Sequence, residues 1–364
     1  MTNRERFLNH MNFKPVDRCF NMETGFWGDV FTEWPVFAAA GVRNNADAYR
    51  LLGMDVLENF WGELIWANTF LDPFYENTVL SETETTTVQL NSYGVVIEKM
   101  KPAYGERSRM LRPSITSPDD WKQVKEQRLN PQSPKRTVNL DGCEKALSCV
   151  GDNPVGLFCG SVVGFVAQML TFEGMIYACH DCPGMVEDMV DACWRLIDGF
   201  LDQVLPRFRF DIACLYENIT CKNGPILPVW FFRDVVQPRY RLICDKLHRH
   251  GVKLISVGSD GDIRPLLPYF LKAGVNCLSP YEVNGCVPPG ELLGQYPGAL
   301  RIIGGVDKLE IARGREAIDR QMESVRKAVE AGGFIPHIDH DVPPSIREED
   351  FLYYLERKRR LLSD

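Results

Sequence analysis

Carboxylates and imidazoles recur in this sequence directly after short apolar segments. Such side chains are the ones that most often hold or transfer protons in enzymes. The densest group lies in the stretch 336–344, where His337, Asp339, His340 and Asp341 fall within five residues, more than a turn requires. The candidate site residues that follow apolar segments are Glu23, Glu58, Glu217, Asp260, Tyr281, Asp307, His337 and His340.

Each of these candidates also has an ordinary structural explanation. Glu23 and Glu58 could pair with arginines of nearby loops, and Asp307 could cap the helix that follows it, where Asp is common. Asp260 lies in a Ser-Asp-Gly-Asp stretch that could be a simple turn. Glu217 and His340 favour the functional interpretation most, the first after an apolar segment and the second inside 336–344.

Aromatic residues cluster after the first two apolar segments. Phe26 and Trp27 follow the first segment, and Phe60 and Trp61 follow the second. These rings could form the wall of an aromatic pocket and contact a substrate there. The alternative is that they are core packing.

The elements that must position these residues alternate along the chain. Patterns of apolar residues at helical spacing, such as 185–205 and 317–329, separate the apolar segments. Strands alternating with helices in one chain of this length predict a (β/α)8 barrel, whose active site gathers at the carboxyl ends of the strands. The eight predicted strands are residues 18–22, 54–57, 155–159, 212–216, 252–257, 275–278, 300–304 and 333–338.

One stretch departs from this alternation. Residues 61–153 are too long for one connection between a strand and a helix, and they form an excursion between the second and third strands. Within it, residues 85–90 and 95–101 flank an Asn-Ser-Tyr-Gly turn and predict a β-hairpin. With no repeat or low-complexity linker, we expect one domain over 1–364, with the excursion as a lid-like insertion.

Composition excludes several classes of protein. The 364 residues carry 41 Lys and Arg against 49 Asp and Glu, a net charge of −8, without the positive surface that a nucleic-acid partner requires. No apolar run is long enough to cross a membrane, and the polar N-terminus does not resemble a signal peptide, so we expect a cytoplasmic protein. The 12 cysteines lie mostly in apolar runs and are expected to be buried thiols.

Several motifs together resemble the uroporphyrinogen decarboxylase superfamily, and they run from about residue 4 to residue 345. Their order and spacing carry the resemblance. They are Arg4-Glu5-Arg6-Phe7, Lys14-Pro15-Val16-Asp17-Arg18, Tyr216-Glu217-Asn218 with Lys222-Asn223-Gly224-Pro225, Ser259-Asp260-Gly261-Asp262-Ile263, Ile302-Ile303-Gly304-Gly305-Val306-Asp307 and His340-Asp341-Val342-Pro343-Pro344.

The resemblance implies a (β/α)8 barrel and one of two chemistries, decarboxylation of uroporphyrinogen or methyl transfer involving corrinoid proteins. The arginine-rich motif of the decarboxylase is replaced here by Met22-Glu23-Thr24-Gly25-Phe26-Trp27-Gly28, which does not suit a substrate with eight carboxylates. The His-x-Cys zinc motif of the coenzyme M enzymes is also absent. The resemblance instead implies a zinc site of oxygen and nitrogen ligands, Glu217, Asp260 and His340, which would also be catalytic.

These departures favour the superfamily members that begin corrinoid-dependent O-demethylation. The expected reaction moves a methyl group from a methoxylated aromatic to the cobalt of a separate corrinoid protein, because the chain has no Asp-x-His-x-x-Gly motif of its own. Two alternatives stay open: a decarboxylase of another carboxylic acid, and a non-catalytic barrel that binds a corrinoid or a tetrapyrrole. The sequence also leaves open a methylamine, a thioether or a folate as the methyl donor, and it leaves open a homodimer.

Overall fold

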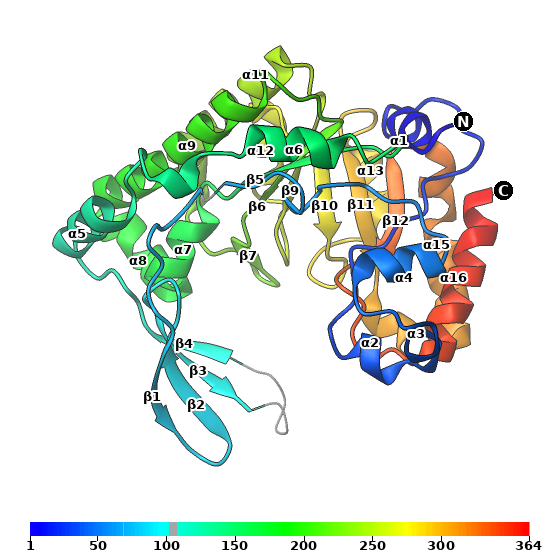
Figure 1. Cartoon of the computed structure of the whole chain (residues 1–364), viewed down its shortest axis with the longest axis horizontal. Coiled ribbons are helices and arrows are strands. Elements are labelled where there is room, and N and C mark those ends of the chain that lie inside the picture. The colour runs from blue at the N-terminus through cyan, green and yellow to red at the C-terminus, as the bar shows by residue number, and fades with distance from the viewer. Residues whose placement is uncertain (68, 102–107, 364) are drawn as a thin grey trace.

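Six parallel strands form the central sheet of the molecule. The computed structural model describes residues 1–67, 69–101 and 108–363. The strands lie in the sheet in the same order as in the chain, and most of their residues are buried because helices cover them (Figure 1). They are β5 (Gly156–Gly160), β6 (Ile212–Tyr216), β9 (Leu254–Gly258), β10 (Cys277–Tyr281), β11 (Arg301–Val306) and β12 (Phe334–Ile338). These strands confirm the third to eighth of the predicted segments.

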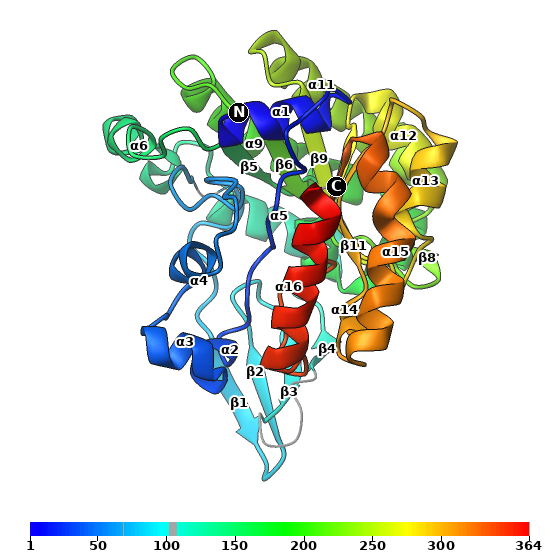
Figure 2. The same ribbon diagram turned by 90° about the vertical axis from the view of Figure 1, so that its right-hand side faces the viewer.

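Helices connect the strands and pack against the sheet and against one another. α9 (Pro183–Val204) and α15 (Arg315–Ala331) match the two helices predicted from spacing. α15 packs on β12 and on α16 (Glu348–Ser363), and Figure 2 shows these two helices side by side. A π-helical turn, Phe232–Val236, precedes α11 (Gln237–Arg249), whose second residue is Pro238.

The remaining helices are shorter, and none of the helices in the described part has both the length and the apolar character that a membrane crossing requires. They are α1 (Asn3–Met11), α2 (Val30–Glu33), α3 (Pro35–Ala40), α4 (Asn45–Leu51), α5 (Pro118–Arg128), α6 (Leu140–Leu147), α7 (Gly164–Leu170), α8 (Phe172–Asp181), α10 (Val229–Phe231), α12 (Leu267–Ala273), α13 (Pro289–Gln295) and α14 (Lys308–Ile311).

The first two predicted strands, 18–22 and 54–57, are not strands. At Asn21 and Ile338, side-chain carboxylates take the backbone N–H groups that a strand ladder would pair with carbonyls. Asp55 accepts the N–H of Asn21 at 2.8 Å and the Arg18 guanidinium at 2.6 Å, and Glu23 accepts the N–H of Ile338 at 2.9 Å. Single parallel bridges, Phe26 to Val342 and Glu58 to Val155, join these irregular segments to the chain beyond β12 and just before β5.

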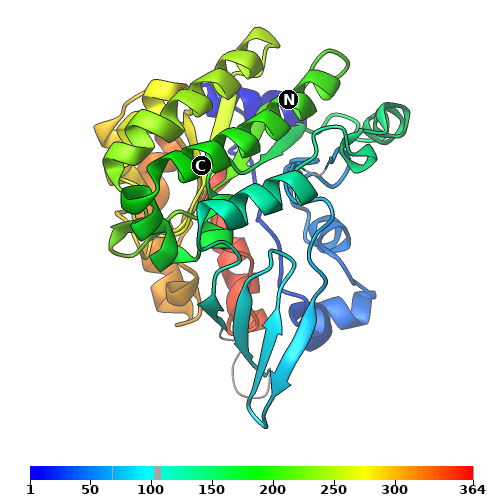
Figure 3. The same cartoon turned by 90° about the vertical axis from the view of Figure 1, so that its left-hand side faces the viewer.

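A separate antiparallel sheet lies between the second irregular segment and β5. Its strands are β1 (Thr78–Glu82), β2 (Thr86–Leu90), β3 (Val96–Met100) and β4 (Ser108–Arg112), in that order. β2 and β3 pair from Leu90 opposite Val96, so the segments expected to form a hairpin are neighbours within four strands. Figures 1 and 3 show this sheet projecting away from the parallel sheet. A short two-stranded ribbon, β7 (Thr220–Cys221) and β8 (Gly224–Pro225), follows β6.

Candidate functional site

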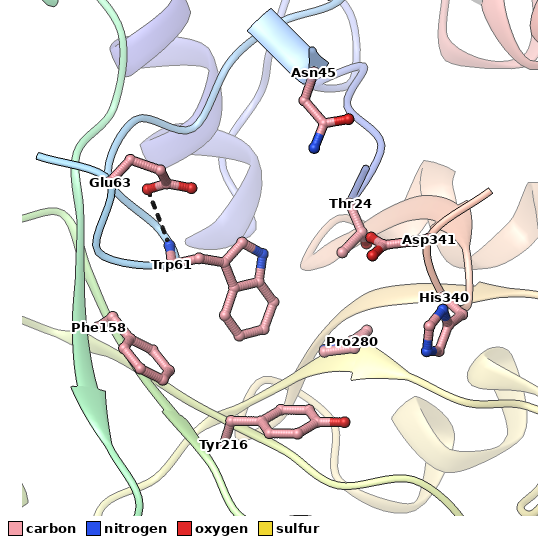
Figure 4. A pocket seen from close by; sticks show the side chains of 9 residues that line it. All are labelled: Thr24, Asn45, Trp61, Glu63, Phe158, Tyr216, Pro280, His340 and Asp341. Atoms are coloured by element: carbon pink, nitrogen blue, oxygen red, sulfur yellow. Dashed lines mark hydrogen bonds between the residues drawn. The ribbon is translucent and has the colours of Figure 1, made fainter. Parts of the chain in front are cut away.

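A pocket of about 460 Å³ opens where the parallel strands end. Phe158, Tyr216 and Pro280 reach it from β5, β6 and β10, and His340 and Asp341 follow β12. The other walls come from the irregular segments and from α4. The lining residues are Thr24, Asn45, Trp61, Glu63, Phe158, Tyr216, Pro280, His340 and Asp341 (Figure 4).

Three aromatic rings form one side of this pocket. The ring centroid of Trp61 lies 5.8 Å from that of Phe158 and 5.9 Å from that of Tyr216. The ring planes cross at 60° and 81°, the edge-to-face arrangement that aromatic quadrupoles favour. We call Trp61, Phe158 and Tyr216 the aromatic wall.

Asn59 holds the loop that carries Trp61. Its backbone is left-handed, with φ of 56°, a conformation that Asn tolerates better than most residues. The side-chain amide donates to the Gly156 carbonyl at 2.9 Å, and its oxygen accepts the N–H groups of Leu64 and Ile65 at 2.8 Å. Trp61 and Glu63 are therefore fixed against β5 by one buried amide.

Polar side chains face the pocket from the opposite side. Figure 4 shows His340, Asp341, Thr24 and Asn45 there. A Cβ at Gly25 would lie 2.8 Å from the Asp341 carboxylate, so glycine at this position lets Asp341 come close to the chain. Burial raises the pKa of Asp341, and the neighbouring His340 lowers it.

Further carboxylates surround the hydroxyl of Tyr216. This hydroxyl donates to Asp260 at 3.4 Å, and its pKa is raised by burial and then by the charges of Asp260, Glu282 and Asp341. Burial and the Glu282 charge raise the pKa of Asp260, while His340 and Lys308 act in the opposite direction. Three carboxylates and two basic groups, His340 and Lys308, therefore act on this side of the pocket.

Glu217 does not face the pocket, contrary to the prediction. Its two oxygens accept the N–H groups of Val162, Val163 and Gly164 at 2.7–2.9 Å and the Ser161 hydroxyl at 2.7 Å. They also accept the Tyr240 hydroxyl, and Glu217 is only 1% exposed. This carboxylate fixes the connection between β5 and α7 and has no oxygen free for a ligand.

The structure does not bring Glu217, Asp260 and His340, the predicted zinc set, together as three free ligands. The donors of Glu217 occupy its carboxylate completely. Among residues 1–67, 69–101 and 108–363, no three His, Cys, Asp or Glu side chains are grouped so that they could hold a metal ion. Asp260 and His340 do lie close enough for the charge of one to lower the pKa of the other.

Three other predicted residues are buried outside the pocket. Glu23 pairs with Lys358 at 2.6 Å and accepts the Tyr354 hydroxyl at 2.7 Å, with both charged side chains fully buried. The Tyr281 hydroxyl donates to the Val287 carbonyl at 2.7 Å. Phe26 packs within a cluster of rings, among them Phe37 and Phe351 at 5.2 and 5.4 Å, so packing explains its position.

Glu58, Asp307 and Trp27 lie near the surface and do not line the pocket. Glu58 accepts from the Asn153 amide at 2.9 Å and faces a separate cavity beside α4. Asp307 caps α14 by accepting the Leu309 N–H at 2.7 Å. Trp27 is 40% exposed, and its ring centroid is 6.3 Å from that of His340, at the rim of the pocket.

His337 lies directly behind a pocket residue. It is 1% exposed, and its ring is 3.2 Å from the Thr24 hydroxyl, which is on the pocket wall. Burial lowers the pKa of His337 to about 4. The imidazole is therefore neutral near pH 7, and it contacts the Thr24 hydroxyl from outside the pocket.

Side chains alternate across a strand, which explains why the sequence analysis missed most of the lining. The prediction places the site at the residue after each strand, but Tyr216 and not Glu217 faces the pocket, and Phe158 precedes the end of β5. Tyr216 is the residue directly before the predicted Glu217. Thr24, Asn45 and Glu63 carry no signal in the sequence, because irregular segments and α4 position them. Asp341 was inside the dense 336–344 stretch.

Comparisons with known proteins place the fold. No family model matches the chain, and no curated protein matches it. Among solved structures, a methyltransferase from Methanosarcina mazei has a TM-score of 0.62 at 14% identity, covering 99% of each chain. A B12-independent methionine synthase from Shewanella sp. W3-18-1 has a TM-score of 0.38 at 12% identity, covering 88% of this chain and 87% of that chain. The first likeness shows that the two chains share a fold.

Proposed function

We propose that this protein moves a methyl group from a methoxylated aromatic, held in the pocket, to the cobalt of a separate corrinoid protein. One observation carries the proposal: the imidazole of His340 lies across the pocket from the aromatic wall. One solved structure that shares this fold is itself named a methyltransferase. The proposed fold is a (β/α)8 barrel whose first two strands have become irregular segments, within one cytoplasmic domain.

The aromatic wall would hold the ring of the donor. Trp61, Phe158 and Tyr216 offer ring faces and edges, and aromatic pairs contribute about 0.5–1.5 kcal/mol beyond their buried area. A methoxybenzene seated there would direct its ether oxygen toward His340. The methyl carbon would then face the pocket opening, where the acceptor docks.

His340 would supply the proton that the reaction consumes. A phenolate leaves poorly, so an acid that protonates the ether oxygen stabilises the transition state. The methyl carbon takes the electron pair of cobalt(I), the electron pair of the broken carbon–oxygen bond stays on oxygen, and the His340 proton makes the product a phenol. Asp260 and Asp341 lie near His340, whose charge lowers the pKa of each carboxyl group.

Zinc has no step in this proposal, because the donor set implied by the resemblance does not fit it. Glu217 is fully engaged by backbone and hydroxyl donors, which leaves Asp260 and His340 as a pair. The decarboxylase alternative receives no support either, since none of the nine described lining residues is Lys or Arg to hold a carboxylate substrate.

The test is methyl transfer from 2-methoxyphenol to free cob(I)alamin without oxygen, followed as equal amounts of catechol and methylcobalamin. Loss of a general acid costs about 10²–10⁴-fold in rate, so His340→Gln should lower kcat by at least about 100-fold. His248→Gln, at an exposed position of α11, is the matched control and should keep full activity. Full activity of His340→Gln, or no methyl transfer by the unchanged protein, would overturn the proposal.

A further inference from the structure

The pocket combines ring faces with negative charge. Two of its nine lining residues are carboxylates, Glu63 and Asp341, and two more that do not line it, Asp260 and Glu282, act on the Tyr216 hydroxyl. Within the described lining, His340 is the one residue that can become a cation. Lys308 is the basic group nearby, and its ammonium already lies 3.7 Å from Glu282 and 3.8 Å from Asp339.

Aromatic rings together with carboxylates can bind a cation that has no hydrogen-bond donors. The faces of aromatic rings attract cations through their quadrupoles, and rings set at steep angles to one another can surround a quaternary ammonium group. Trp61 meets Phe158 at 60° and Tyr216 at 81°. Carboxylates at the edge of such a set of rings add charge attraction without needing an N–H to bind.

We infer that the pocket also takes a quaternary ammonium compound as a methyl donor. The transfer step of this inference rests on the proposed function, whereas the binding does not. The same charges would exclude donors that carry a carboxylate, because they would be repelled by Glu63 and Asp341. The site would therefore select methyl donors by charge as well as by shape.

The ammonium donor differs from the ether in its need for acid. The methyl carbon takes the electron pair of cobalt(I), and the electron pair of the broken carbon–nitrogen bond stays on nitrogen. The donor thereby loses its positive charge and leaves as a neutral tertiary amine. No proton enters the reaction, so His340 has no acid role in it.

Binding is tested first, with choline against 3,3-dimethylbutan-1-ol, its neutral isostere, by titration calorimetry. Choline should bind about 5–30-fold more tightly, the range that cation–π attraction of about 1–2 kcal/mol gives. Trp61→Leu and Glu63→Gln should each remove most of this preference. Trp230→Leu and Glu76→Gln, at exposed positions away from the pocket, are the matched controls and should keep it. Equal affinity for choline and the alcohol would overturn the inference.

Transfer is tested next, with choline and free cob(I)alamin, followed as dimethylaminoethanol and methylcobalamin. His340→Gln should raise the ratio of choline to 2-methoxyphenol turnover by at least about tenfold, since only the ether needs the acid. Methyl transfer from the ether with none from choline would overturn the inference that a quaternary ammonium compound is a methyl donor. Selective choline binding without transfer from either donor would instead overturn the proposed function and leave a quaternary ammonium binding site.

Discussion

At the scale of single residues, the carboxylate of Glu217 supports the site without lining it. Three N–H groups at the start of α7 and two hydroxyls donate to it, so its charge is dispersed over five hydrogen bonds in the protein interior. Burial and the Glu217 charge keep the pKa of Tyr240 well above its ordinary range, so its hydroxyl remains a donor. The Phe158 end of β5 is held in place by this arrangement.

Replacing this carboxylate should destabilise the fold. In Glu217→Gln, an NH₂ group faces N–H donors, and buried donors left without a partner cost about 1–3 kcal/mol. We therefore expect a loss of about 2–3 kcal/mol in the free energy of unfolding, measured with urea. Tyr240→Phe removes only one of the five donors and should cost about 1 kcal/mol. Equal stability of Glu217→Gln and the unchanged protein would contradict this account.

Two buried groups near the pocket should respond to acid in opposite directions. The pKa of His337 falls from 6.5 to about 4 by burial, so its stabilising effect is complete above pH 6.5 and is lost as the pH falls toward 4. Burial raises the pKa of Asp339 from 3.8 to about 6, so stability increases as the pH falls from 6 toward 3.8. The two effects largely cancel in the unchanged protein.

Single substitutions should reveal each effect. Relative to the unchanged protein, His337→Gln should gain about 2 kcal/mol of stability between about pH 7 and 4.5, and Asp339→Asn should lose about 2 kcal/mol over the same range. Urea unfolding at several pH values measures both. The exposed His248→Gln should leave the pH dependence unchanged. If the free energy of unfolding had the same pH dependence in all three variants, the pKa shifts assigned to His337 and Asp339 would be contradicted.

At some strand ends the sequence locates the site to within one residue, but it does not identify all of the residues that line the pocket. His340 was predicted and lines the pocket, whereas Glu217 was predicted and its neighbour Tyr216 lines it. The reason is geometric, since a strand end is easier to find than the face on which its last side chain lies. Asn45 and Glu63 depend on how α4 and the loop after Asn59 pack, which no local pattern encodes.

At the scale of elements, α16 is fixed to the first irregular segment by a buried ion pair. The Lys358 ammonium donates to Glu23 and to the Met22 carbonyl, both at 2.6 Å, and Tyr354 of the same helix donates to Glu23. Glu23 in turn accepts the N–H of Ile338 at the end of β12. The last helix therefore holds together two of the segments from which the pocket is built.

Removing the cation alone should therefore be costly. Lys358→Met leaves the Glu23 carboxylate buried without its counter-ion, which typically costs about 3–5 kcal/mol in the free energy of unfolding. The double variant Glu23→Gln with Lys358→Met has no buried charge and should recover about 2 kcal/mol of this loss. Arg360→Met, on the exposed face of α16, should change stability by less than about 0.5 kcal/mol. A double variant less stable than Lys358→Met would contradict the ion-pair explanation.

The strands themselves divide by how their backbone groups are satisfied. Segments 212–216 and 333–338 are mostly apolar, and each pairs in register with neighbouring parallel strands, so their prediction as strands was confirmed. Segments 18–22 and 54–57 also contain apolar residues, yet Asp55 accepts the N–H of Asn21, and Glu23, which follows the first segment, accepts the N–H of Ile338 in β12. The strand pattern does not report such long-range side-chain partners, which lie 34 residues from Asn21 and 315 from Ile338.

At the scale of the whole molecule, two sheets of different character lie on one chain. The parallel sheet is enclosed by helices, and every residue of β9, β10 and β12 is buried. In the antiparallel sheet every residue of β1 is exposed, and only Val96 and Ile97 of its described strand residues are buried. Figure 1 shows the second sheet standing away from the first. Among the described residues that line the pocket, those that belong to strands all come from the enclosed sheet.

This difference predicts unequal local stability. The backbone opens most easily where few apolar contacts hold it, and its amide hydrogens then exchange with solvent. The amide hydrogens of β1 and β4 should therefore exchange on the order of 100-fold faster than those of β9 and β12. Hydrogen–deuterium exchange with mass spectrometry of peptides from each strand measures this ratio. Urea below the unfolding transition should accelerate exchange in β1–β4 first, because opening that sheet leaves the buried core intact. Equal protection of the two sheets would mean that the antiparallel sheet opens only with global unfolding, and that its exposed strands are stabilised as strongly as the enclosed ones.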